Sequence, residues 1–171
     1  RKVLAAVILL MERTYIRIGN YGYEKMNGSY GLTTLKDKHV AIRSDQLKFS
    51  FKGKKGVFHD ITLKNKKLAK IVKQCRDIPG KELFQYYDED GQRQTLESGD
   101  VNAYLREVTE HDFTAKDFRT WGGTVRMVEC LEQVLDENPE VGKEKSIKEA
   151  VKMVAKSLGN TPTVCTKYYI N

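Results

Sequence analysis

Two alternating runs of residues, joined by a short basic turn, constrain the fold of this chain more than any other feature. In residues 46–51 every second residue is leucine or phenylalanine, and residues 57–63 alternate in a similar way. A period of two is typical of strands that bury one face. The turn between them reads Gly-Lys-Lys-Gly at residues 53–56, and residues 39–43 form a third strand-like run. The sequence therefore predicts a small antiparallel meander of three strands.

Most of the remaining chain has the apolar spacing of helices. Residues 2–14 are predicted to form a buried helix, because their apolar stretch is too short to cross a bilayer. Further helices are expected from the apolar spacing and the capping signals at 65–76, 100–108, 114–136, 144–158 and from Thr161-Pro162 onward. The expected fold class is therefore mainly α with a small three-stranded antiparallel sheet, an α+β fold.

The long helix expected at residues 114–136 has two features of its own. Three aromatic residues, Phe113, Phe118 and Trp121, are expected to anchor it in the core. The adjacent Gly122 and Gly123 are expected to loosen it, because glycine lowers helix stability.

Charge is divided unevenly along the chain, which has a formal net charge of +7. Residues 36–81 contain 14 Lys and Arg against 4 Asp and Glu, whereas residues 82–112 contain 2 against 9. A basic block beside an acidic block gives the protein two different faces, which uniform solubilising charge would not produce. The basic block favours an anionic partner, and nucleic acid is the first candidate.

Several cationic residues are candidates for binding a phosphate, and each has a plain structural alternative. Lys54 lies in the glycine-flanked turn, which could also be a solvated surface turn. Arg17 lies beside a Gly-Asn turn and could equally bridge to a carboxylate. Lys116 and Arg119 are three residues apart near a helix start, where cations and helix dipole favour the same anion, but a salt-bridged surface pair would have the same spacing.

The three cysteines, Cys75, Cys130 and Cys165, are widely spaced and are expected to be reduced thiols. The sequence has no Cys-x-x-Cys pair and no His/Cys cluster, so a zinc site is not expected. The turn at residues 53–56 lacks the spacing of an ATP-binding P-loop.

Taken in order, the segments of this chain resemble the catalytic domain of type IB DNA topoisomerases in the small bacterial and poxvirus-like form. The resemblance covers nearly the whole chain, and the order of the strings makes it specific. The matching strings are Ile16–Asn20, Ser29–Leu35 with Lys38-His39, Phe51–Gly56, Pro79-Gly80, Glu82–Tyr86, Asp100–Leu105, Phe113–Trp121, Leu158–Pro162 and Lys167–Ile170.

The resemblance implies a role for six residues. It identifies Arg17 and Arg119 as the two catalytic arginines, with Lys116 as a supporting cation, and Lys54 as the lysine that protonates the leaving 5′ oxygen. It identifies Tyr169 as the nucleophile. The family position nine residues before this tyrosine is often histidine, whereas here it is Asn160, which can donate a hydrogen bond but carries no charge.

The resemblance also implies the extent of the domain, its partner and its cellular location. Residues 1–171 are expected to form one catalytic domain, without the N-terminal clamp domain of the family and without sequence after Asn171. The expected partner is double-stranded DNA, bound by a monomer with no metal, no ATP and no membrane. A bacterial protein of the cytoplasm and nucleoid is expected.

Two other functions are compatible with parts of the sequence. Tyrosine recombinases share the same catalytic fold, but they usually carry His-x-x-Arg where this chain has Lys116-Asp-Phe-Arg119. A DNA-binding module that kept the fold without the chemistry is the second alternative, although all the cationic positions and Tyr169 are present.

Overall fold

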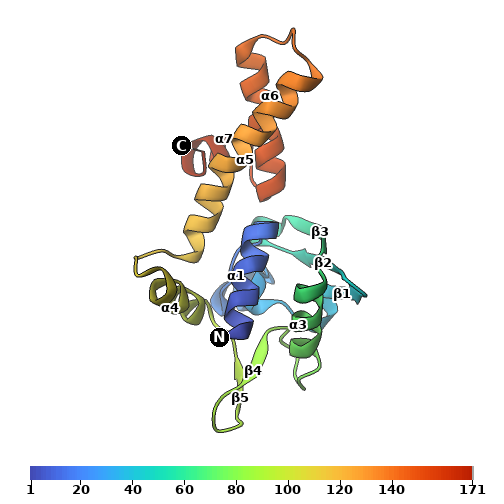
Figure 1. Cartoon of the computed structure of the whole chain (residues 1–171), viewed down its shortest axis with the longest axis vertical. Helices are drawn as coiled ribbons and strands as arrows, with labels where there is room; N and C mark the ends of the chain where they lie inside the picture. Colours follow the sequence, from blue (N-terminus) through green and yellow to red (C-terminus); the bar gives the residue numbers. More distant parts are fainter. Residues whose placement is uncertain (171) are drawn as a thin grey trace. The chain divides into compact units, whose positions relative to one another are not determined.

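The computed structural model describes residues 1–170 and divides the chain into two compact units, Arg1–Ala115 and Lys116–Asn171. Both units are drawn in Figure 1. The first unit carries all the strands, and the second is built of helices.

The three strands predicted from the alternating runs form the sheet of the first unit (Figure 1). Strands β1 (Val40–Arg43), β2 (Gln46–Lys52) and β3 (Phe58–Lys64) pair antiparallel in the order β1-β2-β3. The register places Leu47 opposite Leu63 and Phe49 opposite Ile61, so the apolar residues of both strands point to one face. Residues Leu47, Phe49 and Phe51 of β2 are buried, as the period of two predicts.

Helices pack around this sheet. Helix α1 (Lys2–Thr14) contacts α3 (Lys66–Arg76), α4 (Ser98–Thr109) and β3. Short helical segments fill the connection from α1 to the sheet, namely α2 (Tyr21–Asn27), η1 (Leu32–Thr34) and η2 (Asp37–His39), and η3 (Lys54–Gly56) forms the β2–β3 turn. The largest fully buried side chains of this unit include Leu10, Met11, Leu47, Phe49, Leu68, Leu83 and Phe84.

A second sheet was not expected from the sequence. Strands β4 (Gln85–Tyr87) and β5 (Arg93–Thr95) form an antiparallel hairpin whose acidic turn is organised by Asp88. The Asp88 Oδ1 atom accepts hydrogen bonds from the backbone N–H groups of Asp90 and Gln92, at 3.1 and 2.7 Å. Three-residue strands of mostly polar and aromatic residues give too short a pattern for a period to be recognised.

Three helices make up the second unit: α5 (Ala115–Glu137), whose first residue still belongs to the first unit, α6 (Lys143–Leu158) and α7 (Pro162–Tyr168). The helix is continuous through Gly122 and Gly123. The expectation that aromatic residues anchor it in the core is wrong, because Phe113, which precedes α5, is 47% exposed and Trp121 is 72% exposed. Phe118 is only half-buried. The buried apolar side chains of this unit are instead aliphatic residues and cysteines, and include Cys130, Val134, Ala150, Val154, Leu158 and Cys165.

All three cysteines are free thiols, as predicted, and the structure shows that all three are buried. Burial raises the pKa of the Cys75 thiol to about 11, and burial also raises the pKa of Cys130. Both thiols are therefore neutral and poorly nucleophilic near neutral pH.

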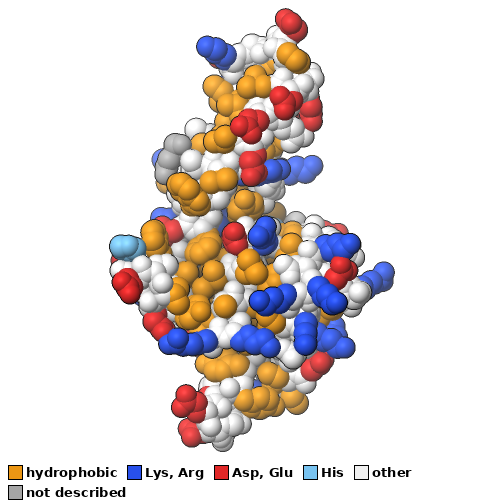
Figure 2. Space-filling model, viewed as in Figure 1, with side chains coloured by type: hydrophobic (Ala, Val, Ile, Leu, Met, Phe, Trp, Pro, Cys, Tyr) orange, Lys and Arg blue, Asp and Glu red, His pale blue; other side chains and the backbone are white. Residues whose placement is uncertain are grey.

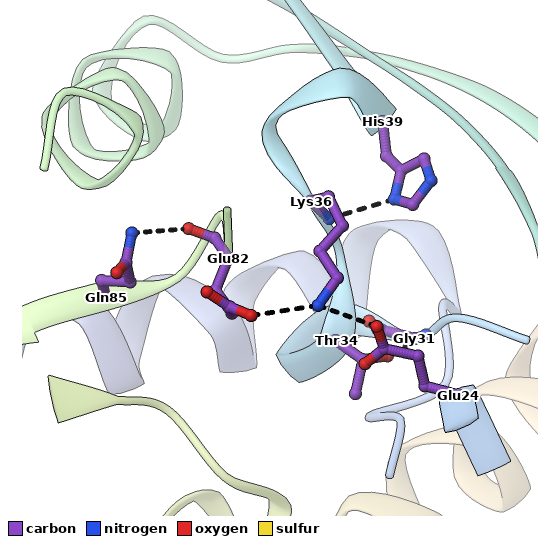
Figure 3. A network of polar contacts seen from close by, with 7 residues as sticks. All are labelled: Glu24, Gly31, Thr34, Lys36, His39, Glu82 and Gln85. Atoms are coloured by element: carbon purple, nitrogen blue, oxygen red, sulfur yellow. Dashed lines mark hydrogen bonds and ion pairs between the residues drawn. The ribbon is translucent and has the colours of Figure 1, made fainter. Parts of the chain in front are cut away.

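A small ionic network joins three segments of the first unit (Figure 3). The Lys36 ammonium group lies 2.8 Å from Glu24 and 3.1 Å from Glu82, and all three side chains are largely buried. Burial lowers the pKa of Lys36, but the two glutamates outweigh this effect, so that its pKa is raised. Burial raises the pKa of Glu82, but the hydrogen bond from Lys36 prevails and lowers it.

Replacing Lys36 with methionine is expected to lower the free energy of unfolding by about 2 kcal/mol at pH 7, because two partly buried carboxylates lose their cation. Because folding lowers the pKa of Glu82, the stability that Glu82 contributes is fully present above its pKa in the unfolded chain, about 4.3. That stability is lost as the pH falls through the lower pKa of the folded state. The difference between Lys36→Met and wild type should therefore persist from pH 7 to about pH 4.3 and shrink as the pH falls further, in urea denaturation.

The matched control is Lys48→Met, which removes an exposed pair with Asp60 at 3.2 Å. It should change the free energy of unfolding by no more than about 0.5 kcal/mol. A difference for Lys36→Met that stays constant with pH would contradict the role given to the glutamates.

Candidate functional site

Arg17 is positioned by a close crossing of two stretches of main chain. The Arg17 carbonyl accepts a hydrogen bond from the Leu32 N–H at 2.9 Å, and the Ile18 carbonyl accepts one from the Thr33 N–H at 2.7 Å. A Cβ atom on Gly31 would lie 2.5 Å from the Arg17 carbonyl oxygen and from the Gly19 backbone. Only glycine permits this approach, and the crossing fixes the backbone on which the half-buried Arg17 is carried.

Lys54 projects from the turn that joins β2 and β3. The Gly53 N–H donates to the Val57 carbonyl at 2.7 Å, which closes the turn, and Lys55 adopts a left-handed conformation with φ 59°. The Lys54 Nζ atom lies 5.8 Å from the centre of the Tyr23 ring on α2. The end of β2 is tied to the segment that follows α2 by a 2.8 Å hydrogen bond from the Tyr30 N–H to the Lys52 carbonyl. Lys54 is therefore exposed on an ordered turn.

Arg119 is the most deeply buried cation of the second unit, with only 5% of its surface exposed. Its Nη2 atom donates a 2.7 Å hydrogen bond to the Leu158 carbonyl, the last residue of α6. Its guanidinium carbon lies 5.4 Å from the centre of the Tyr169 ring. A buried guanidinium is thus held between the end of α6 and the residue after α7.

Asn160 and Tyr169 flank α7. Gly159 ends α6 in a left-handed conformation, and the Asn160 N–H donates to the Ala155 carbonyl at 2.9 Å. Thr161 then caps α7 by accepting a hydrogen bond from the Val164 N–H at 3.3 Å. The Tyr169 N–H donates to the Cys165 carbonyl at 2.9 Å, which continues the α7 hydrogen-bond pattern by one residue.

Within the second unit, the structure brings some of the four predicted residues together and not others. Arg119 and Tyr169 are in contact. Asn160 lies two residues after Leu158, whose carbonyl accepts the hydrogen bond from Arg119. Lys116 is exposed at the start of α5 and has a different environment from the buried Arg119, so the pair does not form one exposed cationic face. Arg17 and Lys54 belong to the first unit.

A basic surface lies over the sheet and α3 of the first unit. Figure 2 shows Lys and Arg side chains gathered over this region, with acidic side chains at the β4–β5 turn. The exposed lysines of the region are Lys48, Lys52, Lys54, Lys55, Lys64, Lys66, Lys67, Lys70 and Lys73. The uneven charge of the sequence thus appears as exposed lysines on the sheet, on the β2–β3 turn that includes Lys54, and on α3.

Residues that support the site were not found from the sequence. Gly31 and Gly123 each permit a close approach of main chain, and Tyr23 lies against Lys54. No local pattern marks them, because each role depends on a segment distant in the sequence.

Comparison with known proteins identifies the family. The sequence profile described as "Eukaryotic DNA topoisomerase I, catalytic core" matches residues 1–170. The DNA topoisomerase 1B of Acanthamoeba polyphaga mimivirus is 34% identical over 173 residues, which cover 96% of this chain and 52% of that protein. The DNA topoisomerase 1B of vaccinia virus (strain Copenhagen) is 29% identical over 168 residues, which cover 96% of this chain and 50% of that protein.

The chain therefore belongs to the DNA topoisomerase I catalytic-core family. Within that family, the relatives named above carry the type IB name, which agrees with the resemblance inferred from the sequence. The chain spans about half the length of the curated relatives it matches. These relatives are viral, so they do not support the expected bacterial origin. No helix within residues 1–170 has the length and apolar content needed to cross a membrane.

Replacing Gly31 with alanine is expected to destabilise the first unit by about 3 kcal/mol, because the new methyl group would overlap main-chain atoms that cannot rotate away. The measurement is chemical denaturation of the variant beside Gly99→Ala, whose added methyl group would meet no atom within 4 Å. Equal stability of the two variants would show that the crossing is less rigid than its geometry indicates.

Proposed function

We propose that this protein cuts and rejoins one strand of double-stranded DNA as a type IB topoisomerase. Tyr169 attacks the scissile phosphodiester and forms a 3′-phosphotyrosyl bond, and the strand with the free 5′-hydroxyl rotates before it is rejoined. The result is removal of supercoils. Membership of the family and the contact of Arg119 with Tyr169 support this proposal.

The observation that carries the proposal is the buried guanidinium beside the tyrosine. Arg119 is held rigidly by the Leu158 carbonyl, and its guanidinium carbon lies 5.4 Å from the Tyr169 ring. Attack on a phosphodiester increases negative charge on the non-bridging oxygens, and a fixed guanidinium stabilises that charge without reorganising. An arginine this close to a tyrosine favours a reaction in which the tyrosine oxygen meets a phosphate.

The remaining roles follow the resemblance. Arg17 is proposed to bind the same class of phosphate oxygen as Arg119, with Lys116 as a supporting cation. Asn160, at the family position that the resemblance describes as often histidine, is proposed to donate a hydrogen bond to a phosphate oxygen. The side chains supply the charge that the reaction needs, so we propose that neither a metal ion nor ATP is required.

The leaving group needs a proton of its own. As the phosphorus–O5′ bond breaks, the electron pair goes to the 5′ oxygen, and Lys54 donates the proton that makes it a hydroxyl. The phenolic proton of Tyr169 passes to water as the new phosphorus–oxygen bond forms. Religation reverses both transfers, and the phosphotyrosyl bond retains the energy that religation uses.

The proposed partner, oligomeric state and cellular location follow the expectations from the sequence. The basic surface over β1–β3 and α3 has the charge required to bind the DNA backbone, and binding should weaken with salt because counterions are released. We propose that a monomer acts on DNA in the cytoplasm and that both units belong to one catalytic domain.

Replacing Tyr169 with phenylalanine should abolish the covalent DNA adduct while leaving DNA affinity unchanged, because only the nucleophilic oxygen is removed. The measurement is plasmid relaxation without ATP or metal, followed by SDS trapping of the adduct. Tyr168→Phe is the matched control, since Tyr168 is 56% exposed and adjacent in sequence. An adduct formed by Tyr169→Phe would overturn the assignment of the nucleophile.

Replacing Lys54 with alanine should slow strand cleavage by about 100-fold or more, the range of a lost general acid. A substrate with sulfur in place of the bridging 5′ oxygen should restore cleavage, because a thiolate leaves without a proton. Lys55→Ala, in the same turn, should cleave both substrates at nearly the wild-type rate. Failure of the sulfur substrate to rescue Lys54→Ala would remove the role of general acid.

A further inference from the structure

The stretch Arg119–Thr124 of α5 contacts Tyr169 through three residues. The Arg119 guanidinium lies 5.4 Å from the Tyr169 ring, and the Thr124 hydroxyl lies 3.4 Å from the Tyr169 carbonyl oxygen. Between them on the helix, Gly123 faces the main chain of the same tyrosine. The ring, the carbonyl group and the backbone of Tyr169 are therefore all held by α5.

The contact at Gly123 leaves no room for a side chain. A Cβ atom there would lie 2.5 Å from the Tyr169 carbonyl oxygen, 3.1 Å from its Cβ atom and 3.2 Å from its carbonyl carbon. Two of these three atoms belong to the backbone, so they cannot move without moving the end of α7. Gly123 is buried and lies inside a helix, where glycine is disfavoured relative to alanine. Its presence at this position therefore calls for a structural reason.

We propose that Gly123 and Thr124 are positioning residues that set the main chain of the nucleophile. This inference rests on the proposed function, because it takes Tyr169 as the attacking residue. The missing side chain of Gly123 lets the Tyr169 backbone lie against α5. The Thr124 hydroxyl, which is also within 3.3 Å of the Thr120 carbonyl, holds the Tyr169 carbonyl there. A rigid helix thus fixes the Cα atom from which the phenol extends toward the phosphate.

A change in the position of Tyr169 should alter the rate of covalent adduct formation and not the affinity for DNA. A reacting atom displaced by about 1 Å can cost about 100-fold in rate, although the binding groups are intact. Gly123→Ala displaces Tyr169 without removing any group that the proposed reaction uses. Phosphate and DNA contacts made by other residues are unaffected, so DNA binding should be retained.

The experiment measures three quantities for Gly123→Ala in the intact protein. The rate of covalent adduct formation in a single turnover should fall by about 100-fold. DNA affinity, measured in the Tyr169→Phe background so that no adduct forms, should stay at its reference value, and thermal unfolding is followed beside it to show that the variant is folded. Gly142→Ala is the matched control in the same unit, because its added methyl group would meet no atom within 4 Å.

A second pair of variants adds no bulk and decides the matter if Gly123→Ala does not fold. Thr124→Val removes the hydroxyl and should slow adduct formation by about fivefold, the usual effect of one hydrogen bond, and Thr124→Ser should restore the rate. Wild-type adduct rates in Gly123→Ala, or in Thr124→Val when Gly123→Ala is unfolded, would overturn the positioning role. Absence of a Tyr169 adduct in the wild-type protein would instead overturn the proposed function, so the two failures are distinguishable.

Discussion

The first unit depends on the crossing of Gly31 over the main chain at Arg17 and Gly19. The hydrogen bonds at this crossing connect the segment after α1 to η1, and the Tyr30 N–H next to it donates to the end of β2. The chain is thus fixed from the buried helix α1 to the turn that carries Lys54. Because the contact is between backbones, side-chain repacking cannot compensate for an added methyl group. A rigid crossing therefore also restrains the β2–β3 turn that carries Lys54.

Electrostatic interactions act on two scales in this unit. The largely buried Lys36, with Glu24 and Glu82, joins α2, the segment before β1 and the segment before β4 through specific contacts. The lysines of the exposed basic surface, by contrast, act mainly through their summed charge, because solvent screens the interaction of each single lysine. The first arrangement stabilises the fold, and the second supplies the attraction to a polyanion.

The sequence was informative where a pattern is local and repeated. The period of two in β2 and β3 correctly predicted the sheet, and the helical spacing of residues 65–76 correctly predicted α3, within one residue. Phe113 and Trp121 were wrongly placed in the core, because aromatic character predicts burial only when a partner surface is available. The β4–β5 hairpin was missed because its strands are short. The contact of Gly123 with Tyr169 joins residues 46 positions apart, which no local pattern encodes.

The six site residues were found by resemblance, and their chemistry differs from the common pattern at one point. By the resemblance, Asn160 stands at a family position that is often histidine, a residue whose ordinary pKa of about 6.5 would change its charge between pH 5 and 8. An amide does not titrate in this range, so the hydrogen bond proposed from Asn160 to a phosphate oxygen would keep a constant strength. We therefore propose that the buried Arg119 carries more of the transition-state charge at the end of α6 and that the contribution of Asn160 is the same at every pH in that range.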